Sequence, residues 1–419
     1  MRWLTLGSIP LILAAATPAQ RDNSLDSRVR AALEKSRPTL LGHLEVAAGG
    51  PLALLCLAGV HDELSLDDPV FAKALERLAK TNLTSTYALG VRLMVMADLP
   101  NFPNREKIAA SDTRKLLRNQ VGSGGFGYQE KSDGYWDLSC TQYGALGMRA
   151  AVSMGCKVHK KHWSGLYRLA KNMQRSDGSF TYGSSGEGYA SMTVAGIAVL
   201  ELCAQHLATP TQKNLEYIGK RLHRAWQWME NEDASIGDHT ARSSFYFHYG
   251  LERAAVLSGR EKVGEISWYQ AGSEMFLKRQ NKSGGWGISN RVVKDGKLIR
   301  GDALQTSFAI LFLRRKFRRY AQIVETGGGA GLSLTLEKGA TDKKIAETVG
   351  LEISRGLKAV PDLLRCMRSE VVAQRRVAAL ALLRLSEKDF GYEPYRRPEE
   401  SAKAIKAAER WWLSMSRKR

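Results

Sequence analysis

Strongly apolar stretches recur along the chain, and each is preceded by a stretch that is apolar on one side only. The strongly apolar stretches are rich in Ala, Leu, Met and aromatic residues. A helix without a polar face has to be buried on all sides. The pattern therefore predicts six buried helices, at 49–60, 84–96, 139–152, 191–203, 244–257 and 304–315.

The stretch 68–80 shows the one-sided pattern. Val70 and Ala74 recur at helical spacing on one face, whereas Lys73 and Glu76 lie on the other. Such a helix has one solvent-exposed face and belongs to an outer layer. The predicted outer helices are 27–41, 68–80, 104–120, 163–174, 215–230 and 267–280.

This alternation of outer and inner helices predicts an all-α fold. Six outer and six inner helices can close into an (α/α)6 toroid, with the inner helices side by side around a central cavity. Closure buries apolar surface that a single helical pair cannot bury alone. A curved, open solenoid is the structural alternative.

Four short segments with a common pattern connect outer helices to inner ones. Glycine in them permits the positive φ that a chain reversal needs. A Gln side chain can hydrogen-bond loop backbone that would otherwise be unpaired. We therefore interpret them as structural staples, in which an aromatic ring covers the seam between repeats. The segments are "QVGSGGFG" from Gln120, "QRSDGSFT" from Gln174, "ENEDASIG" from Glu230 and "QNKSGGWG" from Gln280, at steps of 54, 56 and 50 residues.

These turns resemble the QW motifs of squalene and oxidosqualene cyclases, and they are similar to the corresponding turns of protein prenyltransferase β-subunits. The resemblance covers roughly residues 40–320. The segment "SSFYFHYGLERAAVLSG" (243–259) is similar to exported bacterial proteins with squalene-cyclase/prenyltransferase repeats, most of which have no assigned activity. The resemblance implies an α/α toroid of the terpenoid cyclase type with an apolar central cavity.

Aromatic residues of the inner helices would favour an apolar ligand if they face that cavity. Packing between the two helix layers is the other explanation of the same residues. The candidates for ligand binding are Tyr87, Tyr143, Phe245, Phe247 and Phe308.

The acidic motif of hopene-type cyclases, D-x-D-D-T at the start of an inner helix, is incomplete in this chain. Asp302 and Thr306 match its first and last positions, but Leu304 and Gln305 replace the two further acids. In "DLSCT" (137–141), Ser and Cys stand in the same two places. Protonation of an alkene requires a strongly acidic carboxyl group, which neither Gln nor Cys supplies. We therefore do not predict standard cyclisation.

The zinc site of protein prenyltransferases uses Asp, Cys and His, with a D-x-C spacing. Here Asp137 and Cys140 are three residues apart, and neither His239 nor His248 falls in the family's position. Zinc ligands have to lie about 2.0–2.3 Å from one point. We predict no cofactor, and zinc or magnesium held by these four residues is the alternative.

Several acidic residues lie in the loops that lead into inner helices, and hence at one end of the predicted toroid. Carboxylate pairs carry out glycoside hydrolysis, whereas helix capping explains the same residues without any reaction. The candidate catalytic residues at this rim are Asp137, Glu187, Asp238 and Asp302, together with His239 and His248.

The first residues, "MRWLTLGSIPLILAAATPAQ", carry one Arg, a short apolar run and small residues near Ala19. This order is typical of a secretory signal peptide, here over residues 1–19, and a buried first helix is the alternative. We therefore expect an exported protein, periplasmic or secreted. No later stretch is long and apolar enough to predict a transmembrane segment.

The cysteine count and the net charge limit the kinds of partner that can be expected. Five cysteines without a C-x-x-C pair are expected to be buried structural thiols. A net charge of +20 attracts anions such as acidic glycans, lipid headgroups or an acidic protein. For an exported protein we do not predict nucleic acid as a partner, whereas peripheral membrane contact stays open. A solvated basic surface without a specific partner is the alternative.

The pattern changes beyond the last inner helix. We predict a toroid over 24–320, a Gly-rich linker over 321–345 and a helical module over 346–419. The stretch 360–385 pairs two amphipathic helices and resembles a single HEAT repeat, and Pro398 begins a last helix.

No complete catalytic motif is found, so the sequence favours a non-catalytic role. That role would be the binding or scaffolding of an apolar small molecule, a glycan or a protein partner. The alternative is a divergent enzyme with its site at the inner-helix rim, either cyclase- or prenyltransferase-like or active on glycans.

Overall fold

The predicted all-α architecture is found throughout the computed structural model. Almost all of its secondary structure is helical. The predicted signal peptide (1–19) and most of the predicted linker lie outside the described residues, and within those residues no helix is long and apolar enough to cross a membrane. The structure describes residues 24–130, 133–206, 212–232, 236, 244–287, 291–294, 297–314 and 342–416.

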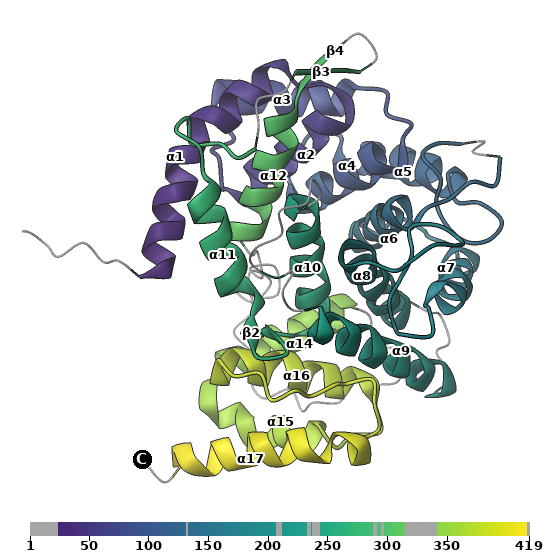
Figure 1. Cartoon of the computed structure of the whole chain (residues 1–419), viewed down its shortest axis with the longest axis vertical. Coiled ribbons are helices and arrows are strands. Elements are labelled where there is room, and N and C mark those ends of the chain that lie inside the picture. Colours follow the sequence, from purple (N-terminus) through teal and green to yellow (C-terminus); the bar gives the residue numbers. More distant parts are fainter. Residues whose placement is uncertain are drawn as a thin grey trace, which may run out of the picture.

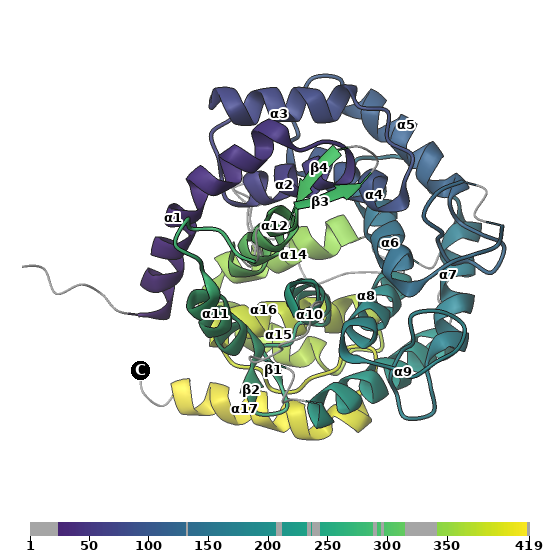
Figure 2. The same cartoon turned by 45° about the horizontal axis from the view of Figure 1, so that its top comes forward.

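The strongly apolar stretches form an inner layer of helices. Each inner helix packs against the next along the chain, and the last packs against the first, so the ring is closed. Figure 2 shows these helices around the centre of the ring. They are α2 (Gly49–His61), α4 (Thr86–Asp98), α6 (Leu138–Ser153), α8 (Ala190–His206), α10 (Ser244–Ser258) and α12 (Gly301–Arg314).

The amphipathic stretches form an outer layer around this ring (Figures 1 and 2). The predicted all-α toroid is confirmed, and the open solenoid is wrong because α12 packs against α2. The outer helices are α1 (Leu25–Val46), α3 (Pro69–Lys80), α5 (Arg105–Arg118), α7 (Lys160–Met173), α9 (Gln212–Asn231) and α11 (Trp268–Arg279).

The glutamines of the repeated turns hold the loops, as predicted, and also reach the next outer helix. Gln174 Nε2 donates to Gly178 O in its own loop at 2.9 Å and to Arg221 O of α9 at 2.8 Å. Gln120 and Gln280 make the same two kinds of bond. Each of these side chains therefore staples one repeat to its neighbour.

A glycine in the turn lets the loop approach that neighbouring helix. Gly124 has a φ of +101°, and a Cβ at this position would lie 2.1 Å from the carbonyl O of Gly165 in α7. Gly284 has a φ of +88° and stands equally close to Lys35 O of α1. Only glycine combines this backbone conformation with so close an approach.

The aromatic residue of the turn is buried against the inner helix. Phe126, Phe180 and Trp286 are 0% exposed. The backbone N–H of Phe126 donates to Thr141 Oγ1 of α6 at 3.0 Å, and the other two make the same bond to a threonine of α8 or α12. The aromatic residue is thus fixed to the inner helix that follows its turn, and the placement of its ring over the seam between repeats stays a prediction.

The copy that begins at Glu230 is built differently. Glu230 Oε1 pairs with Arg260 Nη1 at 3.1 Å, and Arg260 also pairs with Glu393 of the C-terminal part. Ile236 stands at the aromatic position and is buried. An ion pair therefore takes the place of the glutamine staple.

A buried carboxylate joins the two ends of the ring. Asp62, just after α2, is 0% exposed. Its Oδ2 accepts a hydrogen bond of 2.9 Å from Arg37 Nε of α1, and its Oδ1 accepts one of 2.7 Å from Arg314 Nε of α12. Gln280 adds a second link, because its Nε2 donates to Ala32 O of α1 at 2.7 Å.

Two short antiparallel hairpins interrupt the helices. β1 (Lys262–Val263) pairs with β2 (Ile266–Ser267) between α10 and α11. β3 (Arg291–Lys294) pairs with β4 (Lys297–Arg300) directly ahead of α12. The second hairpin therefore stands at the end of the ring where the inner helices begin (Figure 1).

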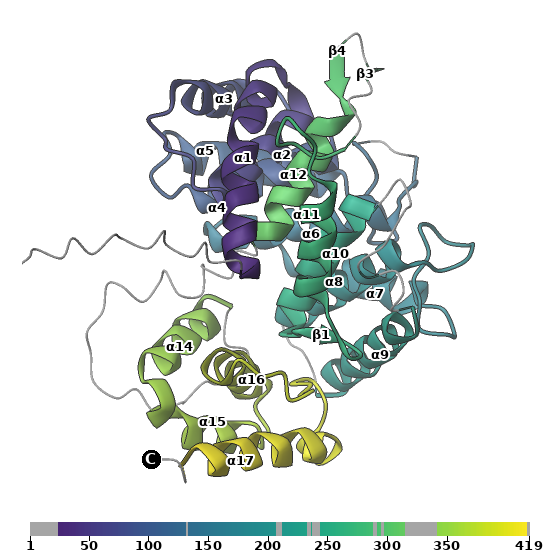
Figure 3. The ribbon, with the colours of Figure 1, turned by 60° about the vertical axis from the view of Figure 1, so that its left-hand side comes forward.

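The C-terminal module lies beside the toroid and has a hydrophobic core of its own (Figure 3). Its first helix begins within the range predicted as linker, and its central pair corresponds to the predicted HEAT-like pair. The elements are α14 (Asp342–Ser354), a 3-10 turn (Gly356–Ala359), α15 (Val360–Cys366), α16 (Val372–Ser386), a second 3-10 turn (Pro398–Ser401) and α17 (Ala402–Ser416).

Candidate functional site

Tyrosines gather at the end of the ring where the inner helices begin. They come from the first two turns of α4, α6 and α10 and from the loops that precede α6 and α8. The group contains seven of the chain's 14 tyrosines. It is called the tyrosine rim below and consists of Tyr87, Tyr128, Tyr135, Tyr143, Tyr182, Tyr189 and Tyr246.

Backbone hydrogen bonds fix the loops that carry the rim. Thr86 N, at the start of α4, donates to Tyr128 O at 2.8 Å. Leu138 N, at the start of α6, donates to Tyr182 O at 2.8 Å. Each loop is tied in this way to the first residue of the preceding inner helix, so its tyrosine is held at the mouth of the ring.

The inner part of the rim is a connected set of side chains from three helices. The ring centroids of Tyr87 and Tyr143 are 4.7 Å apart, and those of Tyr143 and Tyr246 are 6.4 Å apart. Ser139 Oγ bonds to the hydroxyl of Tyr87 and, at 2.7 Å, to that of Tyr246. The hydroxyl of Tyr246 also donates to Gln142 Oε1 at 3.2 Å. These contacts hold the rings in place.

The outer part of the rim faces solvent. Tyr128 and Tyr135 stack with their centroids 6.5 Å apart and an interplanar angle of 16°. The hydroxyl of Tyr128 lies 3.1 Å from that of Tyr182. Tyr128, Tyr135 and Tyr189 expose 46%, 51% and 44% of their surface. Exposed aromatic residues that lie together typically mark a binding surface.

Asp137 lies beneath the rim, and its charge adds to the effect of burial in raising the pKa of two rim tyrosines. It is 0% exposed and caps α6 by accepting a hydrogen bond of 2.7 Å from Cys140 N. Burial and the charge of Asp137 raise the pKa of Tyr189. Burial, the hydrogen bond with Tyr128 and the charge of Asp137 raise the pKa of Tyr182. At neutral pH these hydroxyls are therefore protonated and can both donate and accept hydrogen bonds.

Among the described residues of the two rim loops, the exposed charges are mainly acidic. Glu130, Asp133, Asp177 and Glu187 are all exposed. The guanidinium of Arg175 donates to a backbone carbonyl of its own loop at 2.6 Å. The net charge of +20 is therefore not concentrated in the loops that present the tyrosines.

The acidic residues predicted at the rim are separated by the structure. Asp137 lies under the tyrosine rim, and Glu187 is exposed in the loop before α8. Asp302, in the first turn of α12, lies 3.8 Å from His43 Nε2 of α1. Asp238 lies outside the described residues, as does His239.

His248 lies in an aromatic layer between α10 and the helices packed on it. It is 0% exposed, and its ring centroid lies 5.5 Å from that of Phe276 and 5.8 Å from that of Phe312. Phe247 packs against it at 5.1 Å, and Phe245 lies 5.4 Å from Phe276. Two of the predicted ligand-binding aromatics are thus packed between the helix layers.

The predicted metal ligands are not gathered in the described part of the chain. Cys140 is buried close to Asp137 and Tyr87, and burial together with the charge of Asp137 raises the pKa of its thiol. His248 belongs to the aromatic layer described above. Among the described residues, no three His, Cys, Asp or Glu side chains are arranged to hold a metal ion.

The other predicted ligand-binding aromatics lie at the centre of the ring. Tyr87 and Tyr143 belong to the tyrosine rim, and the Phe308 ring of α12 lies 5.9 Å from that of Tyr246. Phe308 also lies 5.5 Å from Tyr249. Side chains from α4, α6, α10 and α12 therefore meet one another across the ring.

The tyrosines of the outer part of the rim were missed by the sequence interpretation. Tyr128 and Tyr182 each stand two residues after the turn aromatic, Phe126 or Phe180, in two successive copies of the repeat. This shared position was the available signal. Tyr135 carries no comparable signal, because its exposure follows from how the loop folds over α6.

The comparisons with known proteins found similarity only among solved structures. No protein-family model and no curated protein matches the chain. It is similar to a type II terpene cyclase from Scytonema in complex with geranylgeranyl dihydroxybenzoate, with 10% identity over 70% of this chain and 98% of that chain and a TM-score of 0.47.

Two further solved structures match the chain with similar identity, coverage and TM-score. A protein from Actinoplanes shows 15% identity over 68% of this chain and 99% of its own, with a TM-score of 0.46. An unsaturated glucuronyl hydrolase specific for heparin shows 11% identity over 71% of this chain and 97% of its own, with a TM-score of 0.45. These TM-scores are low, so the toroid described above rests on the contacts of this chain's own helices.

Proposed function

We propose that the protein is a non-catalytic carbohydrate-binding protein that holds a neutral sugar chain on the tyrosine rim. The observation that carries the proposal is the set of exposed rings, Tyr128, Tyr135 and Tyr189. A tyrosine ring is apolar on its faces and polar at its hydroxyl. The C–H face of a sugar can stack on such a ring while the sugar hydroxyls exchange hydrogen bonds with the phenols.

The order of the rim supports this proposal. The stacking of Tyr128 on Tyr135 and the bond between Tyr128 and Tyr182 are present without any ligand. Side chains that are already held in place lose little freedom when a ligand binds. A rim of this kind would bind a stiff, repetitive ligand without first being rearranged.

The charges of the rim loops support a neutral sugar over an acidic one. Asp133 and Glu187 add exposed negative charge to the loops that carry these rings, and Glu130 lies 3.9 Å from Arg118. A polyanion would be repelled there, although the protein as a whole is basic. The basic surface elsewhere would serve to attract a protein or lipid partner, or only to keep the protein soluble.

An apolar ligand in the centre of the ring is less well supported. Tyr143, Tyr246 and Phe308 contact one another there. A ligand that entered between them would have to break these contacts and the hydrogen bonds of Ser139. The exposed rings require no such rearrangement.

Glycan hydrolysis is the second candidate, and it rests on Asp137. Oδ2 of this buried carboxylate has no hydrogen-bond partner among the described residues. Hydrolysis needs a second carboxylate about 5–10 Å away. Glu187 of the neighbouring loop is the described candidate for that role, and its exposed side chain would have to turn toward the rim.

The proposal is tested by calorimetric titration of the purified full chain with neutral oligosaccharides of different linkage. We expect one class to bind, and Tyr135→Ala to weaken that binding about tenfold through loss of a stacking ring. Tyr167→Ala, on the outer helix α7, is the matched control and should bind as the unaltered protein does.

Three results would contradict this proposal. Neutral sugars would fail to bind, or Tyr135→Ala would bind them unchanged, or an acidic polysaccharide would bind more tightly. New reducing ends during incubation, lost in Asp137→Asn, would replace the binding role with hydrolysis.

A further inference from the structure

The segment 389–397, called the clasp below, lies between the C-terminal module and the toroid and bonds to both. Toward the module, Arg375 Nε of α16 donates to Pro394 O at 2.7 Å. The hydroxyl of Tyr392 donates to Met367 O at 2.5 Å. These bonds fix one side of the clasp to the module.

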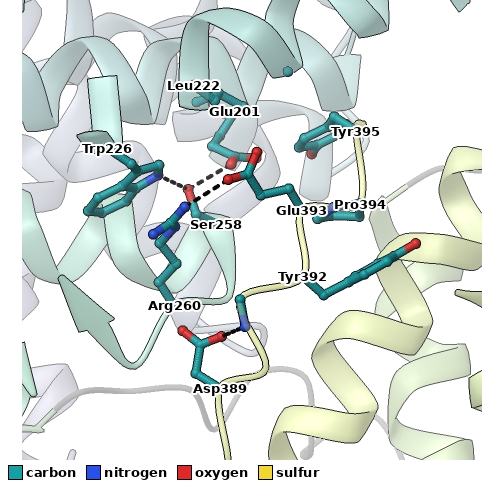
Figure 4. Close-up of a pocket in the computed structure, with 12 residues that line it drawn as sticks. Glu201, Leu222, Trp226, Ser258, Arg260, Asp389, Tyr392, Glu393, Pro394 and Tyr395 are labelled. Carbon is teal, nitrogen blue, oxygen red and sulfur yellow. Dashed lines mark hydrogen bonds and ion pairs between the residues drawn. The ribbon is translucent and has the colours of Figure 1, made fainter. Parts of the chain in front are cut away.

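The other side of the clasp is held to the toroid by charged groups. Glu393 Oε1 lies 3.0 Å from His223 Nδ1 of α9 and 3.0 Å from Arg260 Nη2, which follows α10. Arg397 Nε donates to Glu216 Oε1 of α9 at 2.8 Å. Figure 4 shows Glu393 and Arg260 facing each other across this junction.

A third carboxylate is enclosed beneath the clasp. Glu201 of α8 is 2% exposed, and its Oε1 accepts a hydrogen bond of 2.7 Å from Ser258 Oγ. Ser258 in turn accepts one of 3.2 Å from Trp226 Nε1. Glu201 and Tyr395 line a cavity of about 20 Å³ between the toroid and the clasp (Figure 4). A space of that size holds about one water molecule.

We propose that the clasp is an acid-strengthened latch, which holds the C-terminal module on the toroid in mildly acidic medium and loosens as the medium becomes neutral. The clasp covers a buried carboxylate of the toroid and is itself held by an ionised carboxylate. These two groups respond to pH in opposite directions, and together they define the pH range in which the latch is closed.

Glu201 sets the upper limit of that range. Burial raises its pKa from 4.5 to about 7, and the bond with Ser258, the charges of Arg376 and Arg260, and the hydroxyl of Tyr395 offset part of this rise. The closed latch therefore favours the protonated acid. Its contribution to closure is complete below about pH 4.5 and is lost as the pH rises toward about 7.

Glu393 sets the lower limit. Burial alone would raise its pKa, but the hydrogen bond with His223 and the charges of Arg260, His223 and Arg396 lower it overall. Its contribution is therefore present above its ordinary pKa of 4.5 and is lost as the pH falls below that value. The latch should be tightest near pH 5.

Hydrogen exchange of the full chain measures the latch directly. We expect the protection factors of the clasp amides to fall about tenfold per pH unit between about 4.5 and 7 and then to level off. The amides of α16 should stay protected throughout, because the module comes off as a folded unit.

Variants separate the latch from general stability. Glu201→Gln should remove the fall in protection, because its side chain cannot ionise, and Glu274→Gln on the surface of α11 should keep it. Glu393→Ala should deprotect the clasp at every pH above about 4.5, where the carboxylate contributes, while α16 stays protected.

The latch is wrong if clasp protection does not depend on pH, or if Glu201→Gln retains the dependence. Loss of protection in α16 together with the clasp would also contradict it, because the module would then unfold instead of coming off. If Glu201→Gln does not fold, the pH series and Glu393→Ala still decide between these outcomes.

Discussion

Three of the repeated turns hold neighbouring repeats by a neutral amide, whereas the turn at Glu230 uses an ion pair. Gln120, Gln174 and Gln280 each donate to their own loop and to the next outer helix. Glu230 instead pairs with Arg260. The amide bonds are insensitive to pH, and both of the donor's hydrogens are used within the toroid.

The ion pair leaves N–H groups of the Arg260 guanidinium available for a second carboxylate. Arg260 binds Glu230 at 3.1 Å and Glu393 of the clasp at 3.0 Å. The C-terminal module therefore docks on the toroid at the turn where the glutamine staple is missing. The difference teaches that a degenerate copy of a repeat can be the position at which a further module attaches.

The largest effect is expected from breaking an intact turn at its glycine. Gly124→Ala would place a methyl group 2.1 Å from Gly165 O in a backbone with a φ of +101°. We expect the free energy of unfolding to fall by about 3 kcal/mol or more, measured by urea denaturation. Gly134→Ala is the control, because Gly134 has a φ of +78° but no atom within 4 Å of the added methyl group. Its loss should be about 1–2 kcal/mol, and an equal loss in both variants would show that the close approach is unimportant.

A smaller effect should distinguish the two kinds of staple. Gln174→Ala removes the donor from two backbone carbonyls and should cost about 2 kcal/mol of unfolding free energy, to the same extent at pH 5 and pH 8. Glu230→Ala breaks a partly exposed ion pair and should cost less than about 1 kcal/mol. Equal costs, or a cost of Gln174→Ala that changes with pH, would remove the contrast between the turns.

The smallest effect concerns the bond between turn and inner helix. Thr306→Val leaves the backbone N–H of Trp286 without the 2.9 Å bond to Thr306 Oγ1. We expect a cost of about 1 kcal/mol, seen as a lower melting temperature. Ser307→Ala is the neighbouring control. Among the described residues the Ser307 hydroxyl bonds only to Ala303 O within the helix, so its loss should have little effect. A Thr306 variant as stable as the control would show that the aromatic ring alone holds the turn.

The helices of the toroid could be predicted because the local pattern of apolar and polar residues indicates how far each helix is buried. An inner helix such as α8 has no polar face, and an outer helix such as α3 has one, so periodicity alone assigns their layers. The loop bonds of the glutamines were also predictable. Their bonds to the next outer helix were not, because the partners lie far away in the sequence, as Gln174 and Arg221 do.

The candidate site could be predicted only in part. Asp137 was selected because it leads into an inner helix, and Tyr87 because it is an aromatic residue of one. Both belong to the mouth of the ring. Phe245 also stands near the start of an inner helix, but its ring packs on Phe276 of the outer layer. Within one turn of a helix some side chains point toward the ring centre and others toward the outer layer. The clasp could not be foreseen, because Arg260 and Glu393 are 133 residues apart.

The carboxylate of Asp62 has a consequence for the order in which the protein is made. It joins Arg37 near the beginning of the toroid to Arg314 at its end, a partner 252 residues further along the chain. During synthesis the first helices therefore keep part of their apolar surface exposed until the last inner helix has been produced. Contacts of such long range slow folding. A growing chain of this protein would accordingly depend on being shielded from other chains until the final helix arrives.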